Sequence, residues 1–357
     1  MDRPLRVLAW PADGNRTGNP YNALLAEGLR ARGVTVDEFT PRRLFRGRYD
    51  VWHAHWPEGG MGRGGTVRAL AGAAMTLALA LWARARGTSV MWTVHNLKAH
   101  DAAHPQIERA FWRAWARAVD GSLHLSEVGR HVALTRFPAL RGKPSFVVPH
   151  PHYRTAYPAA PPKAEARARL GLPPDARVLV FVGHVAPYKN VPALVRAFRD
   201  LDASGTRLVV AGRPSTEALG QEVQEAAGDD SRVVLRLHRL TEADLATVIG
   251  AADVVALPYA EVLNSGAALL ALSLDRPVLV PAAGSMTDLR AALGPDWVRL
   301  FDAPLDAADL ADTLAAVTRP DRPTHAPLDR FAPDAVAADT LAVYRVMVGG
   351  ADRRREG

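Results

Sequence analysis

Short apolar segments alternate with segments of helical periodicity along nearly the whole chain. This alternation predicts β-strands joined by α-helices, which form right-handed βαβ units around a parallel sheet. In the first half the predicted strands are residues 5–10, 51–56, 89–95, 122–125 and 145–148, and the predicted helices are residues 21–32, 67–86, 107–119 and 127–136. In the second half strands are predicted near Arg177, Arg207, Arg232, Asp253, Pro277 and Val298. The sequence therefore predicts an α/β protein with two doubly wound, Rossmann-like parallel sheets.

The chain is long enough for two domains. It has 357 residues, of which 48% are hydrophobic, and about 100–200 residues per domain is usual. The proline-rich segment 157–162 (YPAAPP) is typical of a linker. We expect a first domain at residues 1–160 and a second at residues 161–332. A last helix is predicted near residues 333–350, after the second sheet is complete.

Positive charge is concentrated in the first half of the chain. Residues 1–163 hold 23 Lys and Arg against 11 Asp and Glu, whereas the rest holds 21 against 26. Such asymmetry suits a domain that faces phosphate or an anionic membrane, although solvated surface arginines give the same pattern. The sequence has no recognition motif, lysine run or interleaved aromatic residues of a nucleic-acid-binding protein, so nucleic acid is not an expected partner.

The absence of cysteine and the distribution of apolar residues indicate the cellular location of the protein. The chain has no cysteine, which excludes disulfides and thiolate metal sites. The first residues, MDRPLRVLAWP, begin a predicted strand without the pattern of a secretion signal, so we expect a cytoplasmic protein. The most apolar run, residues 69–83, is shorter than the roughly 20 residues that span a bilayer. It predicts a buried helix, with contact to a membrane surface as the alternative.

Two loops of the second half predict a phosphate site. The polar loop Pro258 to Gly266 follows an apolar strand and opens an apolar helix. A helix N-terminus presents free backbone N–H groups and a partial positive charge to an anion. The loop 184–190 also follows a predicted strand, and it carries Lys189. Because ligands bind beyond the carboxyl ends of parallel strands, we expect both loops to hold a nucleotide diphosphate.

Several segments of the second half resemble the donor-binding half of GT-B glycosyltransferases, whose two Rossmann-like domains face each other across a cleft. The matching segments are FVGHVAPYKNVPALVRAF, LVVAGRP, ADVVALPYAEVLNSGAALLALSLDRPVLVP and GSMTDLR. They look most like the large retaining family that contains many bacterial mannosyl- and glucosyltransferases. In the first half, YDVWHAHWPE, WTVHNLKAHD and VVPHPHY are similar to segments of bacterial exopolysaccharide transferases.

The resemblance implies roles for particular residues. It implies that His95 and Glu261 contact the transferred sugar, and we expect the two to meet when the domains close. In such enzymes the C-terminal helix crosses back to brace the first domain. The residues expected at the diphosphate are Gly183, His184, Lys189, Asn264, Ser265 and Gly266. Those expected near the nucleobase are Arg213, His238 and Arg239.

The chain departs from this family at two positions. His184 stands where the family has an arginine, which replaces a permanent cation by a group that is mostly neutral at pH 7. Leu269 and Leu270 stand where a second glutamate is usual, and a leucine cannot bind a ribose hydroxyl. Both changes leave the details of donor binding open.

The first half offers candidates for the acceptor site and for acid–base catalysis. His53 and His55 lie two residues apart and share one face of a predicted strand, and Trp56 is predicted to point to the opposite face. A metal site would need a third ligand that the spacing does not supply, so no metal is expected. We expect His55 or Glu58 to touch the acceptor and His53 to be an interior residue. Glu58 and Asp101 are the candidates for a catalytic base if the reaction inverts the anomeric carbon.

A glycine-containing loop precedes the first helix. Gly14, Gly18 and Asn19 lie between the first predicted strand and a helix that starts near Tyr21. The loop is either a phosphate or acceptor loop or an ordinary βα turn, and it lacks the glycine spacing of a dinucleotide fingerprint.

The sequence as a whole predicts a glycosyltransferase. It would move a sugar from a UDP- or GDP-sugar to a saccharide acceptor, either free or lipid-linked, in exopolysaccharide or cell-surface glycan assembly. The resemblance favours retention, and neither a metal nor another cofactor is expected. We expect a cytoplasmic protein, with a peripheral position at the inner face of the plasma membrane as the alternative. The alternatives are a sugar-nucleotide 2-epimerase, which shares the two-domain fold, and an inactive sugar-nucleotide-binding protein.

Overall fold

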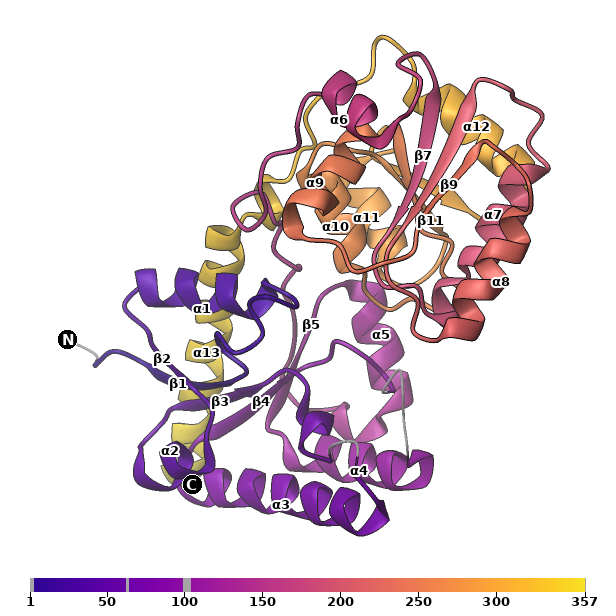
Figure 1. Ribbon diagram of the computed structural model, residues 1–357. Helices are drawn as coiled ribbons and strands as arrows, with labels where there is room; N and C mark the ends of the chain where they lie inside the picture. The colour runs from indigo at the N-terminus through magenta and orange to yellow at the C-terminus, as the bar shows by residue number, and fades with distance from the viewer. Residues whose placement is uncertain (1–2, 62–63, 99–103, 357) are drawn as a thin grey trace. The chain divides into compact units, whose positions relative to one another are not determined.

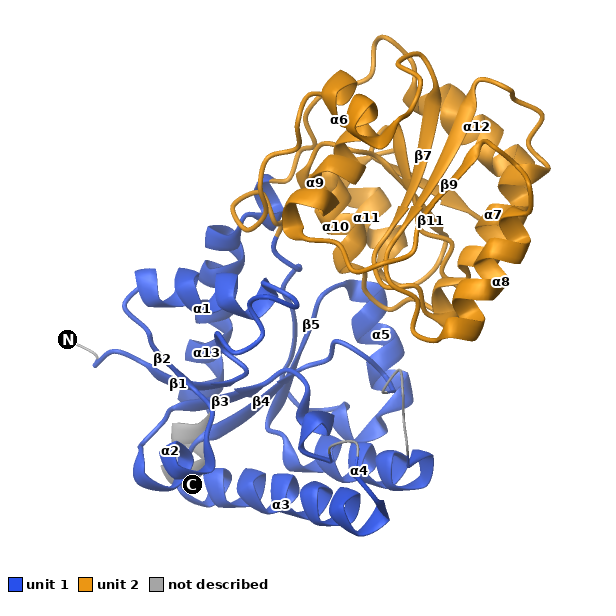
Figure 2. Cartoon of the chain, viewed as in Figure 1, with its two compact units in different colours: residues 1–151, 329–357 blue, residues 152–328 orange. Residues whose placement is uncertain are grey.

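The chain folds into two α/β units (Figure 1). The computed structural model describes residues 3–61, 64–98 and 104–356. One unit consists of residues 1–151 and 329–357, and the other of residues 152–328 (Figure 2). The structural boundary lies before the predicted one at residue 160, because residues 152–160 belong to the second unit. Tyr153, for example, donates its backbone N–H to Ser273 Oγ at 2.8 Å.

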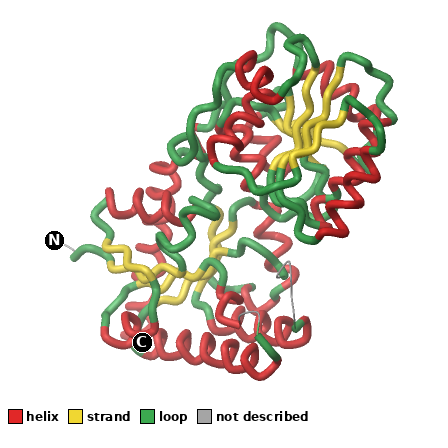
Figure 3. The backbone as a smooth tube through the Cα atoms, in the orientation of Figure 1, coloured by secondary structure: helices red, strands yellow, loops and turns green. Residues whose placement is uncertain are grey.

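Within its described residues, the first unit contains six parallel strands in the order β2-β1-β3-β4-β5-β6. Figure 3 shows the strands of both units in yellow. They are β1 Arg6–Trp10, β2 Thr35–Glu38, β3 Val51–Ala54, β4 Ser89–Thr93, β5 Gly121–His124 and β6 Ser145–Val147. The chain order reverses between β1 and β3, which is where sheets of this type open a ligand crevice. We therefore expect the loops that follow β1 and β3 to contribute to an acceptor site.

Helices cover both faces of the first sheet (Figure 1). They are α1 Tyr21–Ala31, α2 Pro41–Arg46, α3 Thr66–Ala85, α4 Pro105–Ala118, α5 Glu127–Arg136 and α13 Pro333–Glu356, with 3-10 turns η1 Pro57–Met61, η2 Pro138–Leu140 and η4 Asp329–Phe331. Apolar residues of α2, α3 and α4 share one core with Trp52 and Trp92. Those of α1 and α13 share a second core with Val7 and Val51.

The C-terminal helix α13 packs against α1, so the predicted return of the chain to the first unit is correct. The two helices approach so closely that a Cβ on Gly28 would lie 2.6 Å from the Cβ of Ala337. The ion pair between Arg32 and Asp334 lies on the same side. A small residue at position 28 is therefore a condition for this packing.

The second unit also has six parallel strands, in the order β12-β11-β10-β7-β8-β9. They are β7 Arg177–Val182, β8 Thr206–Ala211, β9 Val233–Arg236, β10 Val254–Ala256, β11 Val278–Pro281 and β12 Val298–Phe301. The helices are α6 Lys163–Leu170, α7 Val191–Arg199, α8 Glu217–Ala227, α9 Glu242–Ala251, α10 Gly266–Ser273, α11 Ser285–Leu293 and α12 Ala307–Val317, with the 3-10 turn η3 Pro187–Lys189. This is the Rossmann order, and its reversal falls between β7 and β10.

Two elements of the first unit were not predicted. Strand β2 (TVDE) has one buried residue, Val36, and so lacks an apolar run. Helix α2 (PRRLFR) is short and buries only Leu44, although Thr40 caps it by accepting a hydrogen bond from the Arg43 N–H. Both elements lie at an edge of the fold, where little apolar surface is buried and the sequence signal is correspondingly weak.

Candidate active site

The two loops that were predicted to bind phosphate leave the sheet at its point of reversal. Lys189 ends the turn after β7, and Ser265 ends the loop after β10. The loops are joined by a hydrogen bond of 2.8 Å from the Ala260 N–H to the Tyr188 carbonyl oxygen. The structure thus brings together two of the segments that the sequence singled out.

Lys189 is a cation surrounded by aromatic rings. Its Nζ lies 5.6 Å from the ring centre of Tyr259 and 6.0 Å from those of Phe181 and Tyr188. Desolvation lowers the pKa of Lys189 to about 8. Among the described residues, no carboxylate pairs with it. A desolvated cation without a counter-ion favours an anionic ligand, which would restore the electrostatic balance.

Ser265 caps helix α10. Its Oγ accepts a hydrogen bond of 3.1 Å from the Ala268 N–H and lies 3.4 Å from the Tyr259 Oη. Because the side chain satisfies the Ala268 N–H, the helix start at Gly266 is what an anion could approach. A Cβ on Gly266 would lie 3.3 Å from the Tyr153 Oη. Tyr153 was not predicted as a site residue, although it ends the segment VVPHPHY.

Gly183 and Gly212 allow the loops after β7 and β8 to touch. Gly183 has φ +118° and Gly212 has φ +149°, values that L-residues rarely adopt. A Cβ on Gly212 would lie 1.9 Å from the Gly183 carbonyl oxygen, and a Cβ on Gly183 would lie 3.2 Å from Lys189 Nζ. Glycine at both positions therefore fixes the backbone that carries Lys189.

The other predicted residues of this unit lie on the loops at the same edge of the sheet. His184, Arg213, His238, Arg239 and Glu261 are exposed, and Asn264 is half-buried. Leu269 and Leu270, which replace the expected glutamate, are buried in α10. The structure does not contradict any of these assignments, and their roles stay predictions.

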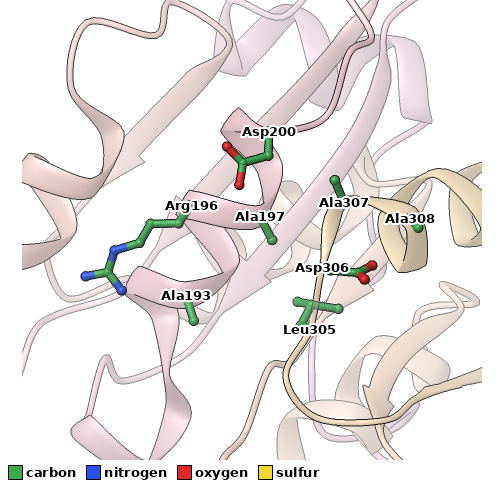
Figure 4. Close-up of a pocket in the computed structure, with 8 residues that line it drawn as sticks. All are labelled: Ala193, Arg196, Ala197, Asp200, Leu305, Asp306, Ala307 and Ala308. Atoms are coloured by element: carbon green, nitrogen blue, oxygen red, sulfur yellow. The ribbon is translucent and has the colours of Figure 1, made fainter.

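A separate cavity of about 430 Å³ lies between α7 and the start of α12 (Figure 4). Its lining includes Arg196, Asp200, Leu305 and Asp306. None of the predicted site residues lines it, so it is not part of the predicted diphosphate site.

In the first unit, histidines from three strand ends form one buried cluster. His53 lies on β3 and His55 just after it, His95 follows β4, and His150 follows β6. His55 Nδ1 lies 3.1 Å from His95 Nε2, and the rings of His53 and His55 are 4.2 Å apart. His53 is bonded on both sides, to Tyr344 Oη at 2.7 Å and to Thr93 Oγ1 at 2.6 Å, which confirms it as an interior residue.

The cluster holds its histidines in the neutral form. Burial lowers the pKa of His53 to about 3 and that of His150 to about 4. Burial, together with the neighbouring histidines, also holds the pKa values of His55 and His95 well below 6.5. Neutral imidazoles donate or accept hydrogen bonds, so at neutral pH the cluster can bind sugar hydroxyls rather than charged groups.

Two aromatic residues complete the cluster and were missed by the sequence reasoning. Tyr21 lies at the start of α1, and the centre of its ring is 4.7–5.6 Å from the ring centres of His55, His95 and His150. Trp56 stacks on His95 at 4.6 Å. Strand alternation had placed Trp56 on the opposite face from the histidines. That prediction is wrong because β3 ends at Ala54, so the alternation does not continue to residue 56.

Glu58 is the carboxylate closest in sequence to this cluster. It lies in the turn η1, directly after β3, and is half-buried. Its Oε2 is buried and has no hydrogen-bond partner among the described residues. Desolvation, with a smaller contribution from Glu108, raises the pKa of Glu58 to about 7. A carboxylate with such a pKa is suited to take up a proton near neutral pH.

The glycine-containing loop already has an anionic partner. The N–H groups of Ala12, Asp13 and Gly14 all donate to Glu38 Oε2, at 2.8–3.0 Å. The amide of Gly14 thus already has a carboxylate acceptor in this structure, and the role of the loop stays a prediction. Gly18 and Asn19 lie further along the loop, and the Asn19 side chain accepts from the Tyr21 N–H at 3.1 Å.

Asp101, the other predicted base, lies outside the described residues. Within the described part of the chain there is no group of three or more His, Asp or Glu side chains that could hold a metal ion.

Comparison with known proteins identifies the family. The sequence pattern of the glycosyl transferases group 1 matches residues 176–319. A GDP-mannose:glycolipid 4-beta-D-mannosyltransferase of Xanthomonas campestris pv. campestris is 32% identical over 315 residues, which cover 88% of this chain and 84% of that protein. The chain belongs to the group 1 glycosyltransferases. It is thus a nucleotide-sugar-dependent glycosyltransferase, as its sequence predicted.

Other relatives of these glycosyltransferases match less of the chain or share only the fold. A D-inositol 3-phosphate glycosyltransferase of Mycobacterium tuberculosis is 38% identical over 127 residues, 34% of this chain and 26% of that protein. Sucrose-phosphate synthase from Thermosynechococcus elongatus has a TM-score of 0.68 at 17% identity and covers 97% of this chain and 100% of that chain. Anabaena Alr3699/HepE in complex with UDP-glucose has a TM-score of 0.63 at 15% identity, with 98% and 100% covered. These neighbours confirm the GT-B fold.

A putative UDP-N-acetylglucosamine 2-epimerase from Listeria monocytogenes also shares the fold. Its TM-score is 0.56 at 12% identity, with 96% of each chain covered. This likeness concerns the fold alone, whereas the similarity in sequence is to glycosyltransferases. The epimerase alternative is not favoured.

Proposed function

We propose that this glycosyltransferase transfers mannose from GDP-mannose to a saccharide acceptor carried on a lipid, at the cytoplasmic face of a membrane, in exopolysaccharide or cell-surface glycan assembly. The mannosyltransferase that is 32% identical over most of both chains supports the donor and the lipid-linked acceptor. The observation that carries the proposal is Lys189, a desolvated cation that has no carboxylate partner among the described residues. Its Nζ lies 5.6 Å from the ring centre of Tyr259, whose Oη lies 3.4 Å from the Oγ of Ser265 at the start of α10.

The leaving diphosphate would be stabilised by protein groups. As the bond between the anomeric carbon and the diphosphate oxygen breaks, negative charge grows on the phosphate. Lys189 and the N-terminus of α10 would offset that charge without a divalent ion. We therefore propose a metal-independent reaction, with Ser265 and Gly266 as the residues nearest the phosphates.

We propose inversion rather than the retention that the family resemblance favours. The name of the relative specifies a β-linked product, and transfer of mannose from an α-linked diphosphate to a β-linkage inverts the anomeric carbon. Inversion requires a base for the acceptor hydroxyl. Glu58, with its unpartnered Oε2 and a pKa of about 7, is the candidate. Its carboxylate would take the acceptor proton as the acceptor oxygen bonds to the anomeric carbon and GDP departs.

The neutral histidine cluster would orient the acceptor. His55 and His95 are bonded to each other, and Trp56 stacks on His95. An aromatic surface beside neutral imidazoles suits a sugar ring, because it offers an apolar face and hydrogen-bonding groups together. We propose that His55, rather than Glu58, contacts the acceptor and that His95 contacts the transferred sugar.

The proposal is tested with a panel of GDP-, UDP- and dTDP-sugars and a lipid-linked saccharide acceptor, with EDTA present. We expect release of GDP and formation of product with GDP-mannose, and NMR of the product should show a β-mannoside. An α-mannoside would refute inversion and the role of Glu58. Transfer from another sugar nucleotide in preference to GDP-mannose would refute the donor, and the absence of any acceptor-dependent release would refute the function.

A further inference from the structure

The outer face of α3 is apolar over its whole length. Five of the large apolar side chains on this helix are 42–82% exposed, namely Val67, Leu70, Met75, Leu81 and Trp82. Exposed alanines at positions 71, 74, 78 and 85 continue the same stripe at helical spacing. The opposite stripe, which includes Ala69, Ala73, Ala80 and Ala83, is buried against the sheet. A helix that is apolar on the side facing solvent requires a partner.

Arginines flank this stripe on both sides. Helix α2 contacts α3 through Phe45 and Trp82, whose ring centres lie 5.5 Å apart, and α4 also packs against α3. On α2, α3 and α4 every exposed charged side chain is an arginine, because Glu108, the acidic residue of α4, is buried. These arginines are Arg42, Arg43 and Arg46 on α2, Arg68 and Arg84 on α3, and Arg109, Arg113 and Arg117 on α4.

A cavity of about 370 Å³ opens beside the end of this face. It is lined by Arg48, Arg86 and Thr88, among others. Asp50 also lines the cavity, but its carboxylate is engaged by Arg3. Among the described residues, neither Arg48 nor Arg86 has a carboxylate partner, although Arg86 lies 5.7 Å over the ring of Trp82. The cavity therefore offers two uncompensated guanidinium groups, which suit a phosphodiester.

We propose that the outer face of α2, α3 and α4 is a membrane-binding face that inserts the apolar stripe of α3 into a bilayer, and that Arg48 and Arg86 bind the phosphodiester of an anionic phospholipid. This inference deepens the proposed function, which requires access to a lipid-linked acceptor. An apolar helix face between rows of cations is the arrangement of interfacial helices on anionic membranes.

The same features argue against two other occupants. In a two-fold dimer formed through this face, the arginines of one copy would oppose those of the other, which is unfavourable. Within the described residues, α3 is also the one helix long and apolar enough, by length and composition, to cross a membrane. Its inner stripe is packed in the core with Trp52 and Trp92, so it lies along the surface of the unit and is not free to span.

The test is cosedimentation of the full chain with vesicles of phosphatidylcholine alone or with phosphatidylglycerol added. Met75→Glu places a charge on the stripe, and Val346→Glu, at a similarly exposed position of α13, is its control. Arg48→Gln combined with Arg86→Gln removes the cavity cations. Arg169→Gln combined with Arg196→Gln, which removes two exposed cations of the second unit, is the control with the same change in net charge.

We expect wild-type binding to depend on phosphatidylglycerol and to weaken with salt. Met75→Glu should weaken binding at least tenfold, and the Arg48 and Arg86 double variant about tenfold or more, while both controls bind as the wild type. Equal binding to neutral and anionic vesicles, or equal effects of variant and control, would overturn the proposal. So would a dimer in ultracentrifugation that only Met75→Glu dissociates. Because vesicle binding is measured without donor or acceptor, it is independent of the transfer assay.

Discussion

At the scale of single residues, burial adjusts two ionisable groups in directions that suit the proposed reaction. It raises the pKa of Glu58 to about 7 and lowers that of Lys189 to about 8. Desolvation disfavours the charged form in both cases, which is why an acid moves up and a base moves down. Each group lacks an ionic partner among the described residues, so both remain ready for a ligand.

The role of Glu58 as a base predicts a pH profile. The carboxylate must be ionised to accept a proton, so kcat/KM should fall as the pH drops below about 7. Glu58→Gln should lower kcat by roughly 10²–10⁴-fold, remove that limb of the profile and leave GDP affinity unchanged. Glu127→Gln, an exposed carboxylate of the same unit, is the control. A Glu58→Gln enzyme with near-normal kcat would exclude this residue as the base.

At the scale of elements, the site depends on how closely the loops after β7 and β8 approach. Gly183 and Gly212 both adopt positive φ, and there is no room for a Cβ on Gly212. The turn that carries Lys189 is thereby held against the neighbouring strand. A change in this contact should shift Lys189 and thereby weaken nucleotide binding.

Gly212→Ala tests that dependence. The added Cβ would lie 1.9 Å from the Gly183 carbonyl oxygen, so the loop must move. We expect a loss of stability of about 1–3 kcal/mol and weaker GDP binding. Gly205→Ala is the control, because a Cβ there meets nothing within 4 Å. Chemical denaturation and calorimetry measure the two effects, and equal behaviour of both variants would show that the contact is not required.

The sequence predicted most elements because their apolar periodicity is strong. The central strands of the second unit, β7, β8, β10 and β11, bury nearly every residue, and continuous apolar runs of this kind are readily recognised. Strand β2 and helix α2 were missed because each buries a single residue. The end of β3 was placed two residues too late, which put Trp56 on the wrong face.

At the scale of the whole molecule, contacts between distant segments decided what the sequence could not. Tyr344 of α13 forms a hydrogen bond with His53, and Glu38 accepts hydrogen bonds from the backbone amides of the glycine-containing loop. The partners are 291 and 25 residues apart in the chain, respectively. No local spacing encodes such pairs. By contrast, the sequence could predict that the loops of Lys189 and Ser265 lie close together. The reason is that loops after parallel strands leave the sheet at the same edge.

The neutral histidine cluster predicts that acid destabilises the first unit. Unfolded histidine takes up a proton near pH 6.5, whereas folding lowers the pKa of His53 to about 3 and that of His150 to about 4. The unfolded state therefore binds more protons below pH 6.5, and the free energy of unfolding should fall as the pH drops toward 4. Each histidine contributes at most about 1.4 kcal/mol per pH unit.

Hydrogen exchange followed between pH 7 and pH 5 measures this effect in each unit. Protection should be lost first in residues 3–151, before the unit of residues 152–328. His150→Gln should reduce the pH dependence, and His238→Gln, an exposed residue of the other unit, should not. Simultaneous loss in both units with an unchanged slope in His150→Gln would show that the cluster does not carry the effect.

The central claim is that Lys189 and the start of α10 hold a nucleoside diphosphate, and calorimetric titration with GDP tests it most directly. Lys189→Ala should raise the Kd about tenfold or more, which corresponds to the roughly 1.5–3 kcal/mol of a hydrogen bond to a charged group. Wild-type affinity should fall as the pH rises above about 8, where Lys189 loses its proton, and the variant should lack that dependence. Arg196→Ala, an exposed cation of the same unit, should bind as the wild type. Equal affinity of wild type and Lys189→Ala across this pH range would contradict the account.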